Sequence, residues 1–208
     1  MILKIQRGQK IFITSDTHYG HTNICWGVSK YKDVEGSFQS LRLFNSLEEM
    51  NNTIVDNINN IVGEDDILIS VGDWSFGGWE NIRKFRNLIR CKNIYLIYGN
   101  HDEHIMNNKD NVQELFIQCS DQMILKYGKL KIIIFHTPIA SWNGLEEGSI
   151  HLHGHMHWRG DNRFFARSMD VGVDGHPEFR PYDLEKEILP LLSNKPIKSR
   201  LQYDHHKK

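Results

Sequence analysis

The sequence contains few cysteines and no long apolar run, and each absence excludes a class of protein. The 208 residues include only Cys25, Cys91 and Cys119, an odd number without a Cys-x-x-Cys pair, which argues against a disulfide framework and favours a reducing compartment. No run approaches the roughly 18 apolar residues of a membrane span, and residues 1–7 lack the apolar core of a secretory signal. We therefore expect a cytoplasmic protein with no membrane partner.

The chain also lacks an excess of basic charge. Lys and Arg number 25 against 26 Asp and Glu, which gives a formal net charge of −1. Strong binding to duplex nucleic acid depends on neutralising many phosphates, so it is not expected here. A content of 39% hydrophobic and 25% charged residues is typical of a globular protein. The unusual count is that of histidine, since 12 histidines cluster along the chain and indicate a chemical site.

Five short apolar runs predict strands that are buried on both faces of a sheet, because apolar and polar residues do not alternate along them. The runs are residues 10–14, 66–71, 93–98, 132–135 and 150–152. Their alternation with helical segments predicts an α/β layered domain in which helices cover the sheet. We expect a single domain over residues 1–192 and a polar C-terminal tail over residues 193–208.

Three segments predict the helices. Ser46 and Glu49 form a capping box at the start of the first helix. Its apolar stripe follows at helical spacing and consists of Leu47, Met50, Ile54, Ile58 and Ile61. The stripe of the second helix consists of Trp79, Ile82, Phe85 and Leu88. The third helix is expected to start at Asp183 and to stop near Pro190, and we assign the apolar stripes to the core.

Asp, Asn and His side chains follow the end of each predicted strand. They are Asp16, His18, Asp73, Asn100, His136, His155 and His157. Because the carboxyl ends of strands in an α/β sheet meet at one edge, we expect these side chains to converge. In Asp16-x-His18 and His155-x-His157, the strand period of two predicts that both side chains point the same way. Seven ligands without cysteine are too many for one tetrahedral ion and favour two catalytic ions that share a bridging carboxylate.

Five motifs occur in order over residues 11–158 of the chain. They are Asp16-x-His18, Gly72-Asp73, Gly99-Asn100-His101-Asp102, His136 and Gly154-His155-x-His157. This series resembles the calcineurin-like metallophosphoesterases, and residues 16–23, 136–144 and 170–174 resemble the small single-domain members of bacteria and their viruses. The resemblance implies a two-sheet β-sandwich flanked by helices, with a dinuclear metal site at the carboxyl ends of the strands.

The resemblance also implies a role for each matching residue. The first ion would be held by Asp16, His18, Asp73 and His157. The second ion would be held by Asp73, Asn100, His136 and His155, so that Asp73 is the bridge. His101 matches the catalytic histidine that is not a ligand, and Asp102 matches the carboxylate that orients it. Imidazole and carboxylate ligands suit two divalent ions of Mn, Fe, Ni or Zn, and Mn is favoured.

This site predicts a metal-dependent phosphoesterase that hydrolyses a phosphodiester of a nucleotide or another small substrate. A hydroxide that bridges the ions would attack phosphorus, and His101 would donate a proton to the leaving oxygen. The alternatives are a phosphomonoesterase, a nuclease for short strands, and an inactive binding scaffold. The scaffold is disfavoured because all seven ligands and His101 are retained.

Two related classes are excluded by local sequence. No arginine follows Asp73 in the second motif, which argues against a phosphoprotein phosphatase, and Trp158 follows His157 where a metallo-β-lactamase motif requires other residues. Four further residues near the motifs are candidate substrate contacts: His21, Asn23, His153 and Arg167. Each has an alternative role. His21 and Asn23 would form hydrogen bonds that order their loop, His153 would support a metal ligand, and Arg167 would lie on a solvated surface. Three tryptophans near the motifs either stack a nucleobase or simply pack: Trp74, Trp142 and Trp158.

Overall fold

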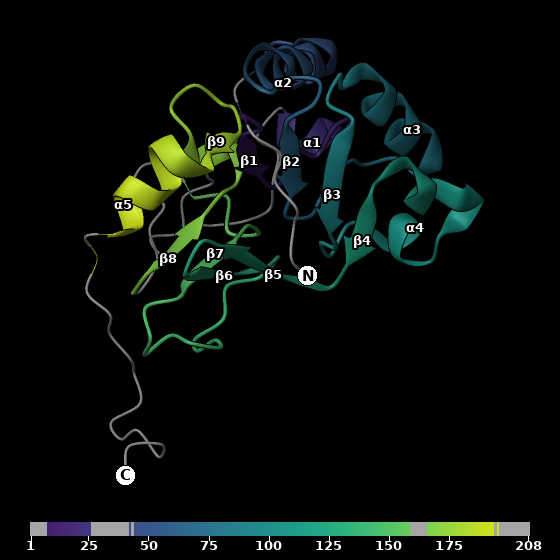
Figure 1. Ribbon diagram of the computed structural model, residues 1–208. Coiled ribbons are helices and arrows are strands. Elements are labelled where there is room, and N and C mark those ends of the chain that lie inside the picture. Colours follow the sequence, from purple (N-terminus) through teal and green to yellow (C-terminus); the bar gives the residue numbers. More distant parts are fainter. Residues whose placement is uncertain (1–7, 26–41, 43, 159–165, 194, 196–208) are drawn as a thin grey trace, which may run out of the picture.

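Two β-sheets stack against each other in the computed structural model, which describes residues 8–25, 42, 44–158, 166–193 and 195 (Figure 1). The first sheet has the order β4-β3-β2-β1-β9 and the second has the order β5-β6-β7-β8. The strands of the first sheet are β1 (Ile11–Thr14), β2 (Ile67–Ser70), β3 (Asn93–Ile97), β4 (Gln118–Ser120) and β9 (Tyr182–Asp183). Those of the second are β5 (Gln122–Tyr127), β6 (Leu130–Phe135), β7 (Ile150–His153) and β8 (Ser168–Asp170).

Strand direction brings most strand ends to one edge. Strands β1 to β4 run parallel, and β9 pairs antiparallel with β1. In the second sheet β6, β7 and β8 are parallel, while β5 forms an antiparallel hairpin with β6. All five predicted strands are confirmed. The sequence did not predict β4, β5, β8 and β9, because these strands are very short or expose side chains on one face.

The unalternating apolar runs are explained by two apolar layers, one on each face of the first sheet. In β1, Ile11 and Ile13 pack in the layer between the two sheets, which includes Ile132 and Leu152 of the second sheet. Phe12, between them, packs in the layer under the helices. Since both faces of the strand are covered, all four of its side chains are buried and only Thr14, at its end, is polar.

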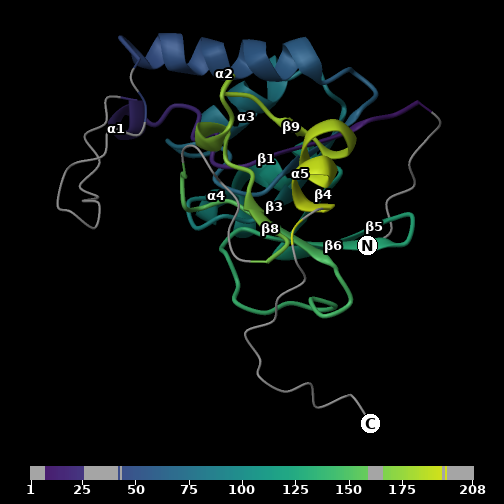
Figure 2. The same cartoon turned by 90° about the vertical axis from the view of Figure 1, so that its left-hand side faces the viewer.

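Helices cover the outer face of the first sheet, where α2 lies across it with α3 (Figures 1 and 2). The α-helices are α1 (Thr22–Cys25), α2 (Leu47–Ile61), α3 (Trp79–Leu88), α4 (Glu103–Met106) and α5 (Leu189–Ser193). Shorter helical segments are η1 (Lys109–Leu115), η2 (Val173–Gly175) and the π-helical turn η3 (Leu184–Ile188). No helix in the described ranges has the length and apolar character that crossing a membrane requires.

Helix α2 begins at the predicted cap. The Ser46 hydroxyl accepts the Glu49 N–H at 3.0 Å, as a capping box requires. The Glu49 carboxylate, however, accepts the N–H of Asn45 at 2.8 Å, one residue before the Ser46 N–H that a capping box would use. Helix α3 differs from its predicted stripe, because Trp79 and Leu88 are 41% and 43% exposed. They are the first and last residues of the helix, and only its middle turn is buried.

The C-terminal helix runs further than predicted. It starts as expected, since the Asp183 carboxylate accepts the N–H groups of Glu185 and Lys186. It continues past Pro190 to Ser193, because the Leu189 N–H bonds back to Leu184 in a wide π-turn. Proline has no N–H to donate to the preceding turn, and the wide turn just before it accommodates the ring.

Candidate metal centre

The loops that follow β1 and β2 stay joined beyond the strands and carry the first three predicted ligands. The Asp16 N–H donates to Gly72 O and the His18 N–H donates to Asp73 O, each at 3.0 Å. Ser15 also pairs in parallel with Gly172, just after β8. The edge of the first sheet is therefore tied to the edge of the second, and ligands from both sheets reach one region.

Two glycines let these loops approach at backbone distance. A Cβ atom at Gly154 would overlap Ser15 Oγ and Asp16 Oδ2, and a Cβ atom at Gly99 would overlap Asp73. Any larger residue at either place would displace a ligand carboxylate. These two motif glycines are thus explained by lack of space, whereas Gly72 also has a φ of +97° that favours glycine.

Five of the seven predicted ligands have left-handed backbone angles. Their φ values are 55° for Asp16, 47° for His18, 54° for Asp73, 71° for His155 and 51° for His157. The predicted extended geometry of the two paired motifs is therefore wrong. Such conformations cost about 1–3 kcal/mol each and concentrate at functional sites, where the surrounding structure holds them in place.

All seven predicted ligands converge. The groups Asp16, His18, His157 and Asp16, Asp73, His136 each offer ligand atoms that lie within 4.8 Å of one another. Asp73 Oδ2 lies 3.4 Å from His18 Nε2 and 3.5 Å from His136 Nε2. Asn100 Oδ1 lies 3.0 Å from His136 Nε2 and 2.9 Å from His155 Nδ1. Asp73 thus stands between the two sets of histidines, and Asp16 belongs to both groups.

The donor set fits divalent cations. Asp16 and Asp73 are buried, and among the described residues no Lys or Arg pairs with either carboxylate. His18 Nδ1 is buried and has no hydrogen-bond partner within that part of the chain. Buried carboxylates cost free energy unless positive charge offsets them, and oxygen with imidazole nitrogen is a donor set typical of transition metals.

The histidines of the site differ in basicity. Burial opposes protonation of His136, but its hydrogen bond with Asp73 and the charge of Asp16 outweigh burial and raise its pKa to about 9. Burial and the neighbouring His157 hold the pKa of His18 well below its usual range. The charges of Asp73 and Asp16 thus favour the protonated form of His136.

His101 is exposed beside the ligands. Its ring centroid lies 5.3 Å from that of His18, and its backbone N–H donates to Asp73 Oδ1 at 2.9 Å. The imidazole of His101 therefore faces solvent next to the carboxylate that stands between the two sets of histidines.

Asp102 does not contact the His101 imidazole as the resemblance implied. Its buried carboxylate accepts the N–H groups of Asp73 and Gly99, each at 2.8 Å, and that of Trp74 at 3.0 Å. No hydrogen bond to the His101 side chain occurs among the described residues. Asp102 starts α4, and its side chain turns inward under the loops rather than outward along the helix. It fastens the loop after β2 to the loop after β3, and burial raises its pKa to about 7.

Two of the four candidate substrate contacts are bonded to main-chain carbonyl groups. His153 is buried and Nδ1 lies 3.0 Å from Gly154 O, which agrees with the alternative of supporting a ligand loop. Arg167 lies at the amino end of β8, opposite the ligands, and donates to the carbonyl groups of Gly148, Ser193 and Lys195. Arg167 lies apart from the predicted ligands because the two ends of β8 are on opposite edges of the sheet.

The other two candidates lie on the side of the site nearest α1. His21 stacks on Phe76 with ring centroids 4.1 Å apart, and burial together with His101 lowers its pKa to about 4. Asn23 is exposed on α1. Trp74 and Trp142 are buried and pack in the apolar layers, so neither offers a face to a ligand.

Sequence reasoning missed Arg42 and Asp174. Asp174 Oδ2 lies 2.8 Å from His157 Nδ1, and Arg42 holds the same carboxylate. Burial opposes ionisation of Asp174, but Arg42 outweighs burial and lowers its pKa well below the usual range. Asp174 follows β8, so the strand-end rule would have found it had β8 been predicted. No signal in the sequence points to Arg42.

The calcineurin-like phosphoesterase family model matches residues 9–174, and the chain belongs to this family. An uncharacterized protein of Methanocaldococcus jannaschii is 32% identical over 151 residues, which cover 72% of this chain and 70% of that protein. The Gene 66 protein of Mycobacterium phage D29 is 26% identical over 204 residues, covering 86% and 95% of the two chains.

A solved structure shares the fold. The crystal structure of a protein of unknown function from Aquifex aeolicus superposes with a TM-score of 0.63 and 20% identity, and covers 88% of this chain and 100% of that one. The predicted α/β fold with two sheets flanked by helices is confirmed. The chain is a phosphoesterase-family protein whose Asp and His groups are able to bind metal.

Proposed function

We propose that the protein hydrolyses a small phosphodiester with the help of two divalent cations, Mn being favoured. The observation that carries the proposal is the position of Asp73 Oδ2, within 3.5 Å of both His18 Nε2 and His136 Nε2 and next to His101. One cation would be held by Asp16, His18, Asp73 and His157, and the other by Asp73, Asn100, His136 and His155. When bound, such a pair supplies a water nucleophile at neutral pH and neutralises the charge that builds on the phosphoryl oxygens.

The chain's own residues would orient and protonate the substrate. The exposed His101 lies where it can donate a proton to the leaving oxygen, a contribution that is typically about 10²–10⁴-fold. Its backbone N–H holds Asp73 Oδ1, which leaves Oδ2 directed at His18 and His136. Asp102 would keep the two loops that carry Asp73 and Asn100 in register.

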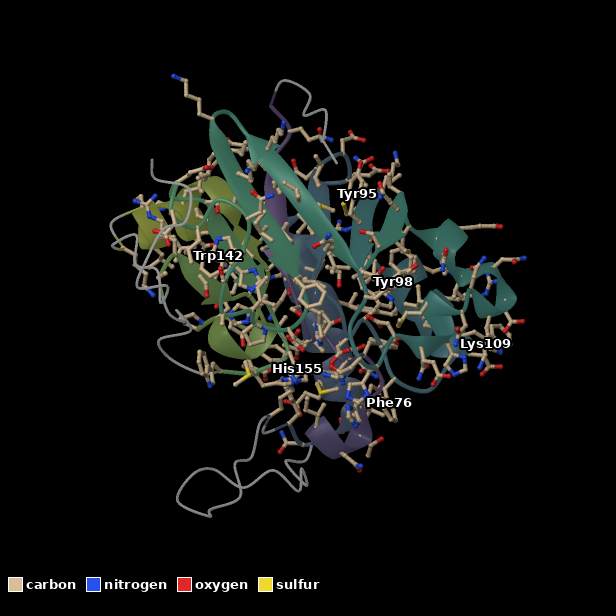
Figure 3. The ribbon with its side chains drawn as sticks, turned by 90° about the horizontal axis from the view of Figure 1, so that it is seen from below. Phe76, Tyr95, Tyr98, Lys109, Trp142 and His155 are labelled. Carbon is tan, nitrogen blue, oxygen red and sulfur yellow. The ribbon has the colours of Figure 1, made fainter. Side chains whose placement is uncertain are left out.

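An exposed aromatic ring supports a diester with a planar group, such as a nucleotide. Phe76 is 41% exposed, stacks on His21, and lies 5.9 Å from the His101 ring between centroids. The Phe76 N–H donates to Tyr19 O at 2.8 Å and fixes the main chain there, while the stack on His21 orients the ring. Figure 3 shows Phe76 and His155 at the same edge of the molecule. A nucleobase or aryl group would stack on the exposed part of this ring.

The test is an assay with the full chain, stripped of metal and reloaded with Mn²⁺. We expect turnover of bis-p-nitrophenyl phosphate that a chelator abolishes and that exceeds turnover of the monoester. Asp73→Asn should lower kcat/KM by about 10²–10³-fold or more, as when a group that stabilises the transition state is removed. Asp65→Asn, which alters an exposed carboxylate, is the matched control. Metal-independent turnover would refute the proposal, and faster turnover of the monoester would show a phosphomonoesterase.

A further inference from the structure

Arg42 is a buried cation whose guanidinium is fully used in hydrogen bonds. It is 1% exposed, and Nε and Nη2 donate to Asp174 Oδ1 and Oδ2, each at 2.9 Å. This is the two-pronged pairing that only arginine forms with a carboxylate. Two of the remaining hydrogen bonds go to main-chain oxygens, from Nη1 to Thr17 at 2.9 Å and from Nη2 to Asp16, and Nη1 also donates to Met50 Sδ at 3.7 Å.

The Asp174 carboxylate connects Arg42 to a predicted metal ligand. Its Oδ2 also lies 2.8 Å from His157 Nδ1, while His157 Nε2 lies 3.7 Å from Asp16 Oδ1. A carboxylate on one ring nitrogen fixes the tautomer and the ring orientation, so that the other nitrogen is free to bind metal. Asp174 therefore directs Nε2 of His157 toward Asp16.

The contacts of Arg42 favour one of the two ligand groups, because Asp16, which belongs to both, is held only at its main-chain oxygen. Through Asp174 it holds His157, and through the Asp16 and Thr17 carbonyls it holds the left-handed turn that carries Asp16 and His18. These three ligands form one of the two groups whose atoms lie within 4.8 Å. Among the described residues, no hydrogen bond joins Arg42 or Asp174 to His136, Asn100 or His155, which serve the other side.

We infer that Arg42 and Asp174 are positioning residues that build the cation site of Asp16, His18 and His157, and reach the other site only through the main chain of Asp16, which belongs to both groups. The inference rests on the proposed dinuclear function and makes the two sites unequal. Asp174 has two tasks, since it aims His157 and also neutralises a guanidinium that would otherwise repel a cation nearby. A lysine at position 42 keeps the charge but cannot hold both carboxylate oxygens and two carbonyl groups together.

The test is a metal titration of the full chain, read by elemental analysis and by competition with a chromogenic chelator. Wild-type protein should take up two Mn²⁺ ions. Asp174→Asn and Arg42→Gln should each lower the affinity for one of these ions by about 10–100-fold, the usual effect of losing a group that orients a ligand. The other ion should keep its affinity. Electron paramagnetic resonance should then change from the signal of a coupled pair to that of a single Mn²⁺.

Two controls separate positioning from loss of folding. Arg86 is half-buried and donates to the carbonyl groups of Leu115, Ile89 and Lys92, away from the site, so Arg86→Gln should lower stability without changing either ion. In a His157→Ala background, Asp174→Asn should add no further loss of metal affinity. This second result keeps the test decisive if Arg42→Gln does not fold.

The outcomes distinguish this inference from the proposed function. The inference would be overturned if Asp174→Asn bound both ions as tightly as wild type does, or if its affinity for both ions fell by the same factor. Either result would leave the dinuclear site itself intact. Wild-type protein that takes up no stoichiometric metal would instead overturn the proposed function on which the inference rests.

Discussion

Asp102 Oδ2 accepts the backbone N–H of Asp73 at 2.8 Å, so a buried carboxylate fixes the residue that stands between the two sets of histidines. Two further N–H groups, of Gly99 and Trp74, point at the same carboxylate. The hydrogen bonds hold main chain rather than the His101 imidazole. The residue after the motif histidine therefore stabilises the shape of the site, and its loss should be visible without any substrate.

Asp102→Asn places an amide NH₂ against one or more backbone N–H donors. We expect it to lower the free energy of unfolding of the metal-free protein by about 1–3 kcal/mol, the cost of leaving a buried donor unsatisfied. Urea denaturation measures this, with Asp65→Asn as the control at an exposed carboxylate. Unchanged stability together with an altered pH profile of kcat would instead support direct orientation of His101.

Gly154→Ala adds a methyl group where Ser15 Oγ and Asp16 already lie. We expect a loss of stability of about 1–3 kcal/mol from overpacking, and a weaker affinity for Mn²⁺ because Asp16 must move. Gly128→Ala is the control, since Gly128 has φ +58° and open space around it, and so tests backbone strain without overlap. Equal affinity for Mn²⁺ in Gly154→Ala and wild type would show that Asp16 is not displaced.

Phe76→Leu removes the exposed ring beside His101 and keeps an apolar side chain. We expect kcat/KM for bis-p-nitrophenyl phosphate to fall about 2–13-fold relative to methyl p-nitrophenyl phosphate, because stacking of an aromatic pair contributes about 0.5–1.5 kcal/mol. The two substrates share a leaving group and differ only in the part that does not react. Trp79→Leu changes another exposed aromatic residue, on α3, and is the control. The same substrate ratio in Phe76→Leu and wild type would remove the planar-group preference.

His151 makes the protein sensitive to acid, independently of the metal ligands. His151 Nδ1 lies 3.1 Å from Ile133 O, and Nε2 accepts the Ile139 N–H at 3.3 Å. The neutral ring, with its proton on Nδ1, satisfies both groups. A second proton on Nε2 would face the Ile139 N–H. Burial, together with His153, lowers the pKa of His151 to about 4. Since the pKa in the unfolded chain is higher, the unfolded state takes up the proton first, and stability falls as the pH drops below about 6.5.

The slope expected from this group is about 1.4 kcal/mol per pH unit between pH 6 and pH 4. His151→Gln should lower stability at neutral pH but reduce the slope by that amount. Urea denaturation of the metal-free wild type and variant across this range gives the difference between their slopes. The contributions of the other histidines are common to both proteins and cancel in this difference. Identical slopes for the two proteins would contradict the prediction.

The positions of five strands and of the seven predicted ligands at their ends were predictable from the sequence because both follow from local order. A short β-branched run predicts a buried strand wherever it lies, and the residue after it is at the carboxyl end of that strand. Ile11, Phe12 and Ile13 illustrate this, since two faces of one strand are apolar and both turn out to be covered. The capping of α2 by Ser46 was predictable for the same reason.

Only the tertiary structure decided how these side chains are held. Asp16 and His18 have left-handed angles that no strand period predicts, because loops from both sheets impose them. Arg42 and Asp174 lie 132 residues apart in sequence, and their pairing exists only once the end of β8 packs against the turn after β1. The sequence determined which atoms are able to bind metal. The packing of loops from distant segments determined which partner each of those atoms has, since a buried hydrogen bond depends on what lies within about 3 Å of it in the folded chain.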